Sequence, residues 1–359
     1  MSESETSSGD VCIVGLGAAT AVGETALATA AAVRAGVAGF RDHTFMTDGQ
    51  GEPMVVASAP YIDEFVLVEE RLAKLAAMAV TEALTPLTDL QGQVRTVPFL
   101  VGLPEPRPGF TAQLEPQVVE WFRRVFQFGG IAEPEFNRGG HCGGFAAVQS
   151  AVEKLRSGAT DFCLAGGVDS YIDPDTLEWI EDSEQLHNGI NAFGFVPGEA
   201  AGFCLLCTEA TAPRFELPVL GRIAKIATTR EENCIKSEKV CTGRGLTDAF
   251  RLVLESLPND LMMNDMICDQ NGEPYRAEEL GFTWIRTIRH FGEEMEFQSP
   301  ADCWGDVGAA SGPLFIALAS MAAQKGYAKG PYNLLWTSSE AGHRTAAVFH
   351  AETNGKGPN

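Results

Sequence analysis

The chain has 359 residues, 45% hydrophobic and 21% charged, which is typical of a globular protein with room for two cores. Its 26 basic and 48 acidic residues give a formal net charge of −22 at pH 7, which disfavours nucleic acids and anionic membranes as partners. No apolar run reaches the length of a membrane span. The nine scattered cysteines, and a polar start without a secretory signal, predict a reduced, cytoplasmic protein.

Apolar and amphipathic segments alternate along the first part of the chain. A strand begins at Val11 and runs into a glycine-rich turn. Gly15 and Gly17 match two glycines of a dinucleotide-binding loop, but the third is out of place, so nucleotide binding is disfavoured. The periodicity then predicts helices at 24–36, 67–84 and 118–128, and strands at 54–59 and 96–102.

The stretch 137–158 holds the strongest candidate for chemistry. A glycine pair and His141 lead into Cys142, and an amphipathic helix follows with Phe145, Val148 and Leu155 on one face. A cysteine just before a helix N-terminus meets free N–H groups and the helix dipole, which lower a thiol pKa and make a nucleophile. The alternative is that Cys142 is an inert, buried apolar residue among small neighbours.

The same alternation continues to the end of the chain. Strands are predicted at 161–167, 219–228, 265–268, 333–337 and 345–350, and helices at 247–257, 277–291 and 313–324. The stretch 193–206 is predicted to turn tightly and to enter a further strand. Cys204 and Cys207 have the spacing of a metal-binding pair, but no second pair accompanies them, so we expect no metal. The pattern predicts a layered α/β protein. Its regions are a disordered lead (1–10), an N-terminal half (11–213), a C-terminal half (214–352) and a frayed tail (353–359).

Several stretches, in this order, resemble the β-ketoacyl synthase group of the thiolase superfamily. They are the first strand and turn (14–23), the cysteine elbow and following strand (142–167), a glycine–glutamate turn (193–202), a Gly-Ala-Ala turn (308–310) and the closing segment (342–349). The resemblance implies a thiolase-like five-layer αβαβα fold of two similar halves, usually dimeric. It also implies a cysteine that accepts an acyl group from a thioester of coenzyme A or acyl carrier protein, without a cofactor. Histidines, or a histidine and an asparagine, would then stabilise an enolate.

The chain departs from this pattern at both histidines. Asn271, or Gln270 on a strict count, falls at the place of the first, and Asp306 most nearly takes the place of the second. An ungapped comparison puts His141 at the nucleophile position, but we favour Cys142 because Cys-Gly-Gly-Phe matches the elbow. Asn271 and Asp306 have the alternative role of capping turns. The resemblance therefore implies as candidate catalytic residues Cys142, His141, Asn271 and Asp306, and as substrate-binding residues Gly143, Phe195, Gly342 and His343.

Two hypotheses remain open. The first is a divergent acyltransferase of fatty acid or polyketide biosynthesis that binds an acyl thioester and transfers or hydrolyses the acyl group through Cys142. Normal condensation is disfavoured, since losing one charge-stabilising donor costs about 10²–10³ in rate. The second is a catalytically silent partner of a true ketosynthase, like a chain-length factor. The retained Cys142 favours the first, and the absent histidines favour the second. Either a homodimer or a heterodimer is compatible with the sequence.

Overall fold

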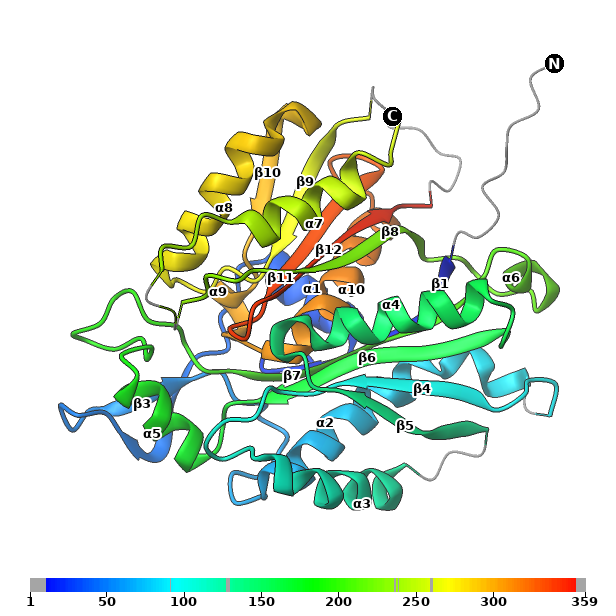
Figure 1. Cartoon of the computed structure of the whole chain (residues 1–359). Coiled ribbons are helices and arrows are strands. Elements are labelled where there is room, and N and C mark those ends of the chain that lie inside the picture. The colour runs from blue at the N-terminus through cyan, green and yellow to red at the C-terminus, as the bar shows by residue number, and fades with distance from the viewer. Residues whose placement is uncertain are drawn as a thin grey trace.

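Ten strands form one continuous sheet in the computed structural model, which describes residues 11–90, 92–126, 130–235, 237, 239–258 and 261–352 (Figure 1). The order across the sheet is β10-β9-β11-β12-β8-β1-β7-β6-β4-β5. The predicted lead at 1–10 and tail at 353–359 lie outside the described residues. The strands are β1 (Val11–Thr20), β4 (Val97–Gly102), β5 (Ile131–Asn137), β6 (Phe162–Ser170), β7 (Glu199–Thr208), β8 (Gly221–Arg230), β9 (Met263–Cys268), β10 (Phe291–Gln298), β11 (Tyr332–Ser338) and β12 (His343–His350).

The sheet consists of two halves with the same topology. In the N-terminal half, β1 is antiparallel to β7, β7 is antiparallel to β6, and β6, β4 and β5 run parallel. In the C-terminal half, β8, β12, β11, β9 and β10 repeat this arrangement. Residues 11–13 of β1 pair with residues 221–223 of β8 and join the halves. The boundary predicted between residues 213 and 214 falls in α6 (Thr211–Arg214), between the halves, and stays a prediction.

Helices cover the outer faces of the sheet and fill the space between its halves. The outer helices are α2 (Val68–Ala83) and α3 (Glu115–Val125) on the N-terminal half, and α7 (Arg244–Leu254) and α8 (Pro274–Thr287) on the C-terminal half. The inner helices are α1 (Ala26–Arg34), α4 (Gly143–Arg156) and α10 (Ser311–Gln324). The structure therefore has the αβαβα order of layers that the sequence predicted.

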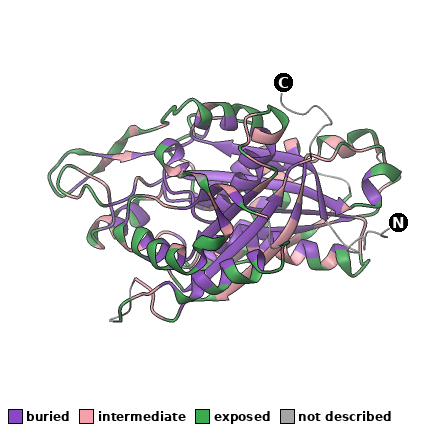
Figure 2. Cartoon of the chain, turned by 90° about the horizontal axis from the view of Figure 1, so that it is seen from above, coloured by how far each residue is buried: buried purple, intermediate pink, exposed green. Residues whose placement is uncertain are grey.

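Burial follows this layering (Figure 2). Every residue of β1 and β6 is buried, as expected for strands covered on both faces. Helix α10 is buried around its whole circumference over residues 311–321, because it is apolar on all sides and lies in the central layer. The outer helices α2, α3, α7 and α8 instead bury one face each.

The remaining elements lie at the edges of this core. A small sheet packs against α5, and α9 leads into the Gly-Ala-Ala turn; these elements are β2 (Arg41–Thr47), β3 (Pro53–Val56), α5 (Pro174–Asp182) and α9 (Ala301–Trp304). The 3₁₀ turns are η1 (Thr85–Leu90), η2 (Ala112–Leu114), η3 (Gly140–Cys142), η4 (Ile288–His290) and η5 (Gly308–Ala310). Among the described residues, no helix combines the length and the apolar character that crossing a membrane requires.

Three strands were not predicted from the sequence. They are β2, β5 and β10, and the last two are the edge strands of the large sheet. The helix predicted at 277–291 was wrong at its end, because α8 stops at Thr287 and Phe291 begins β10. Edge strands are covered on fewer sides, so their sequences lack a continuous apolar run.

Candidate functional site

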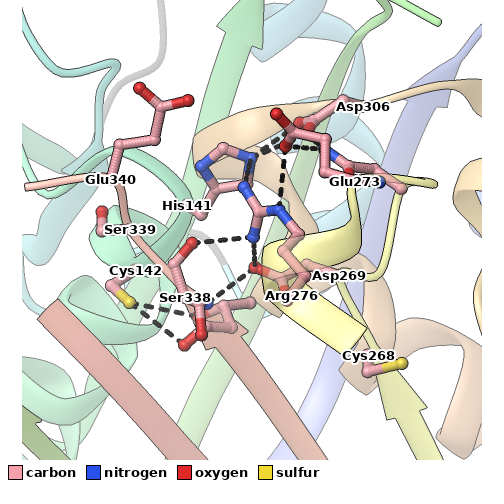
Figure 3. Close-up of polar contacts among 12 residues, drawn as sticks. His141, Cys142, Cys268, Asp269, Glu273, Arg276, Asp306, Ser338, Ser339 and Glu340 are labelled. Carbon is pink, nitrogen blue, oxygen red and sulfur yellow. Dashed lines mark hydrogen bonds and ion pairs between the residues drawn. The ribbon is translucent and has the colours of Figure 1, made fainter. Parts of the chain in front are cut away.

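Five chain segments converge where α4 begins, and together they form the candidate site (Figure 3). They are η3 with the start of α4, the end of β9 with the loop after it, the first turn of α8, the turn before η5, and the end of β11 with the loop into β12. The turn at η5 requires glycine at position 308, where φ is +45° and a Cβ would lie 2.0 Å from Asp169 Oδ2. Gly144 allows α4 to approach this turn, because a Cβ there would lie 2.4 Å from the Ala309 carbonyl oxygen.

A buried ion pair between His141 and Asp306 joins the two halves at this point. His141 Nε2 lies 2.8 Å and 2.9 Å from the two Asp306 carboxylate oxygens, and the residues are 5% and 4% exposed. Burial and the nearby Arg276 lower the pKa of His141, but the Asp306 and Asp269 carboxylates together outweigh them, so the pKa of His141 is raised. Burial also opposes the Asp306 charge, yet His141, Arg276 and the Gly308 N–H together lower the pKa of Asp306. These shifts favour the charged forms of both residues, and the hydrogen on Nε2 is directed at Asp306.

Arg276, from the first turn of α8, occupies the centre of the same cluster. Its guanidinium bonds Asp269 at 3.0 Å, Glu273 at 3.3 Å and the Ser338 carbonyl oxygen at 2.9 Å. One Nη also lies 3.2 Å from His141 Nε2. Because Nε2 carries the hydrogen that Asp306 accepts, this last contact places two donors side by side rather than forming a hydrogen bond. The surrounding carboxylates make that proximity tolerable.

Asn271 completes the cluster on the side of the C-terminal half. Its Nδ2 donates to Asp306 at 2.7 Å and to Glu273 at 3.0 Å, while its Oδ1 accepts from the Glu273 N–H. Asn271 thus has the turn-capping bond considered from the sequence, and it also holds two carboxylates in place. A cavity of about 210 Å³ opens onto this cluster, with His141, Arg276 and Asp306 in its wall beside Phe195.

Cys142 faces the opposite side of the same turn. Its sulfur points away from Asp306 and lies 3.3 Å from each of two carbonyl oxygens, of Thr337 and of His343 (Figure 3). Cys142 is 1% exposed. Burial raises the pKa of the thiol, in spite of hydrogen bonds from the Thr337 and Thr345 hydroxyls that favour the thiolate. The side chain is therefore a neutral thiol that donates to the backbone.

A second cavity, of about 420 Å³, lies on the Cys142 side. Cys142 and His343 are in its wall, and neither is in the wall of the cavity at His141. His343 Nδ1 is buried and has no hydrogen-bond partner among the described residues. The structure thus separates the predicted site residues into two groups, His141 with Asn271 and Asp306, and Cys142 with His343.

The remaining candidates serve the geometry of the turns. Gly143 packs within 3.2–3.4 Å of the backbone of residues 102, 103 and 137, measured from the position of an added Cβ. Gly342, at φ +102°, forms the tight return into β12 and accepts the Glu231 N–H at 2.7 Å through its carbonyl. Of the four predicted substrate-binding residues, Phe195 faces the first cavity and His343 the second.

Three comparisons with known proteins bear on this fold. The family model described as the β-ketoacyl synthase N-terminal domain matches residues 141–212. No curated protein matches the chain. A chain of the AntDE:AntF complex, described as a type II polyketide synthase acyl-carrier protein in complex with its ketosynthase bound to the hexaketide, aligns over 96% of this chain and 100% of that chain with TM-score 0.76 and 14% identity. The chain has the ketosynthase fold.

Two further solved structures show the same likeness in fold to this chain. The ishigamide ketosynthase/chain length factor aligns over 96% of this chain and 99% of that chain, with TM-score 0.75 and 14% identity. The ketosynthase from module 6 of the bacillaene synthase from Bacillus subtilis 168 aligns over 96% and 72%, with TM-score 0.72 and 13% identity. The resemblance stated from the sequence is confirmed at the level of the fold.

The sequence analysis missed the residue at the centre of the candidate site. Arg276 is 1% exposed, and on α8 it shares the buried face with Glu279, Leu280, Thr283 and Thr287. These positions follow the spacing i, i+3, i+4, i+7 and i+11 of a single helical face. A search for charged residues on the buried face of a helix, rather than for apolar ones, could have found Arg276.

Proposed function

We propose that this chain is a catalytically silent ketosynthase-like subunit that pairs with an active ketosynthase, in the manner of a chain length factor. The observation that carries the proposal is the state of the turn at α4. His141 Nε2 donates its hydrogen to the Asp306 carboxylate at 2.8 Å. A ring nitrogen that carries a hydrogen has no free lone pair with which to attack a thioester.

The charges around the first cavity also oppose condensation. An enolate or a tetrahedral intermediate needs donors aimed at a developing negative charge. Here Glu273 accepts from Arg276 Nε, Asp269 accepts from Arg276 Nη1, and Asp306 adds a third carboxylate nearby. A negative charge that develops in this cavity would therefore face three carboxylates and an arginine that two of them already engage.

The choice of partner follows from charge and from the comparisons. Two copies of a chain with a net charge of −22 repel each other, which favours a less acidic partner. A ketosynthase/chain length factor and a complex of a ketosynthase with an acyl-carrier protein are among the solved structures with this fold. A ketosynthase that retains the nucleophilic cysteine and both histidines would supply the chemistry that this chain lacks.

Mixing the purified chain with such a ketosynthase tests the proposal. Size-exclusion chromatography with light scattering should show a one-to-one complex, and condensation should follow the partner's nucleophilic cysteine and be unaffected by Cys142→Ala in this chain. Condensation by this chain alone, abolished by Cys142→Ala, would contradict the proposal.

A second candidate function is acyl transfer through Cys142, and the cavity of about 420 Å³ beside its thiol favours it. Intact-mass measurement after incubation with acyl-coenzyme A, and separately with iodoacetamide, distinguishes the two functions. For a silent subunit we expect no stable acylation, and alkylation first at the partly exposed Cys234 and Cys241. Acylation that is lost in Cys142→Ala would establish the second function instead.

A further inference from the structure

A separate cavity of about 430 Å³ lies away from the candidate site, between the inner helices and the C-terminal half of the sheet. Its wall includes parts of α1, α10, β9, β10 and the start of β11. It shares no lining residue with the cavities at His141 and Cys142. A volume of this size is in the range of small-molecule sites.

An unsatisfied donor lies in the wall of this cavity. Asn333, in β11, is 2% exposed, and its Nδ2 has no hydrogen-bond partner among the described residues. Side chains alternate along a strand, and Leu335 belongs to the inner core whereas Leu334 and Trp336 belong to the outer one. The amide of Asn333 therefore points into the inner layer, where the cavity lies. A buried donor without an acceptor is costly, so the site is suited to an oxygen atom of a ligand.

The wall of the same cavity also contains an arginine, Arg34, that pairs with no carboxylate of the described residues. Arg34, in the last turn of α1, lies with its guanidinium 3.9 Å from the centre of the Tyr327 ring. Within the part of the chain that the structure describes, it forms no ion pair. The acidic residues of the cavity are engaged elsewhere, because Glu296 pairs with Lys329 Nζ at 2.8 Å and Asp265 accepts the Lys329 N–H at 2.9 Å.

The surface between these two polar groups is apolar. Ala30 and Val33 of α1, Leu318 of α10 and Ile267 of β9 are buried and line the cavity. Such a wall favours a hydrocarbon or aromatic body. The carboxylates of Asp265 and Glu296 at the rim disfavour a dianion such as a phosphate monoester, so a single negative charge fits better.

We propose that this cavity binds a small monocarboxylic acid with an apolar body and a second, neutral oxygen, as in an oxo-acid or a hydroxybenzoate. The carboxylate pairs with Arg34 and stacks beside Tyr327, and the carbonyl or hydroxyl oxygen accepts the hydrogen bond of Asn333 Nδ2. The proposal does not depend on whether the chain is silent or catalytic, because the cavity is remote from both groups of candidate residues.

Isothermal titration of the purified full-length chain tests this proposal with 4-hydroxybenzoate and a series of oxo-acids from 4-oxopentanoate to 8-oxononanoate. At least one probe should bind saturably. Arg34→Gln should weaken that probe at least about tenfold, and Asn333→Leu by a similar factor. Arg251→Gln, which removes an arginine from the outer helix α7, should leave affinity within about twofold.

A ligand lacking the second oxygen provides the internal check. Benzoate, or the alkanoate of equal length, should bind the parent chain and Asn333→Leu with similar affinity, because the lost hydrogen bond is absent in both cases. Arg34 is exposed, so Arg34→Gln keeps the test valid if the core variant fails to fold. The proposal is overturned if no probe binds at about 10 mM, or if both variants bind as the parent does.

Discussion

Asp306→Asn removes the charge that holds His141 at the centre of the site while keeping the shape of the side chain. Removing one member of a buried ion pair typically costs about 3–5 kcal/mol. His141 can respond by losing its proton, and Arg276 retains Asp269 and Glu273. We therefore expect the lower end of that range, about 3 kcal/mol, which for a chain of 359 residues corresponds to a fall of roughly 4 °C in the thermal midpoint.

The pH dependence of this loss identifies its cause. The pKa of His141 is raised in the folded state, so its contribution is complete below the ordinary value of 6.5 and disappears as pH rises through the raised value. The pKa of Asp306 is lowered, so its contribution is present above 3.8 and disappears at more acidic pH. The difference in midpoint between parent and variant should therefore be greatest near pH 5–6 and shrink toward pH 9.

Differential scanning fluorimetry and urea unfolding at pH 5.5, 7 and 9 measure this difference. The matched control is Glu133→Gln, which breaks an exposed ion pair with Arg123. The side chains of Arg123 and Glu133 are 53% and 73% exposed, so we expect no measurable change in the midpoint of this variant. The reasoning would be refuted by a fall of less than about 2 °C at pH 5.5, or by a difference that grows toward pH 9.

Three further predictions concern the packing that supports the site. Glu199→Gln breaks the fully buried ion pair with Arg71, whose atoms lie 2.8 Å apart, and urea unfolding should show a destabilisation of about 3 kcal/mol. A loss of less than about 1 kcal/mol in the free energy of unfolding would contradict this ion pair. Gly144→Ala places a Cβ 2.4 Å from the Ala309 carbonyl oxygen, so near-ultraviolet circular dichroism should show a displaced turn, and an unchanged spectrum and midpoint would contradict the close approach. Phe145→Ala removes a ring that is 0% exposed in the inner core and should cost about 3–5 kcal/mol, whereas a cost under about 1 kcal/mol would mean that α4 is not packed as described.

Much of the fold could be predicted because its central strands are buried along their whole length. β1 and β6 are buried at every position, and the continuous apolar runs at 11–14 and 162–165 reflect this. The edge strands β5 and β10 could not be found in this way. β5 carries Glu133, Pro134 and Glu135, and β10 is also rich in glutamate, so neither has the continuous apolar run of a buried strand, and Pro134 argues against a strand.

The composition of the site was harder to predict than the fold. The sequence brought Asn271 and Asp306 together through the resemblance, and in the structure they are hydrogen-bonded. It did not decide between His141 and Cys142, because adjacent residues at the start of a helix point about 100° apart. If the chain is aligned with the family one residue differently, the nucleophile position moves from His141, which faces Asp306, to Cys142, which faces the second cavity. The three-dimensional structure is needed to tell which residue faces which way.

The charged cluster is better suited to holding a fixed arrangement of side chains than to moving protons. A general acid or base has to change its charge during a reaction, and this requires a pKa near the working pH. In this cluster each cation raises the cost of neutralising its carboxylates, and each carboxylate raises the cost of neutralising its cations, so the pKa values of His141 and Asp306 move apart. Buried ion networks add little net stability, but they fix one arrangement of the groups that form them. Here the groups come from both halves of the chain, so the cluster fixes how the start of α4 and the loop after β9 are placed for whatever molecule binds above them.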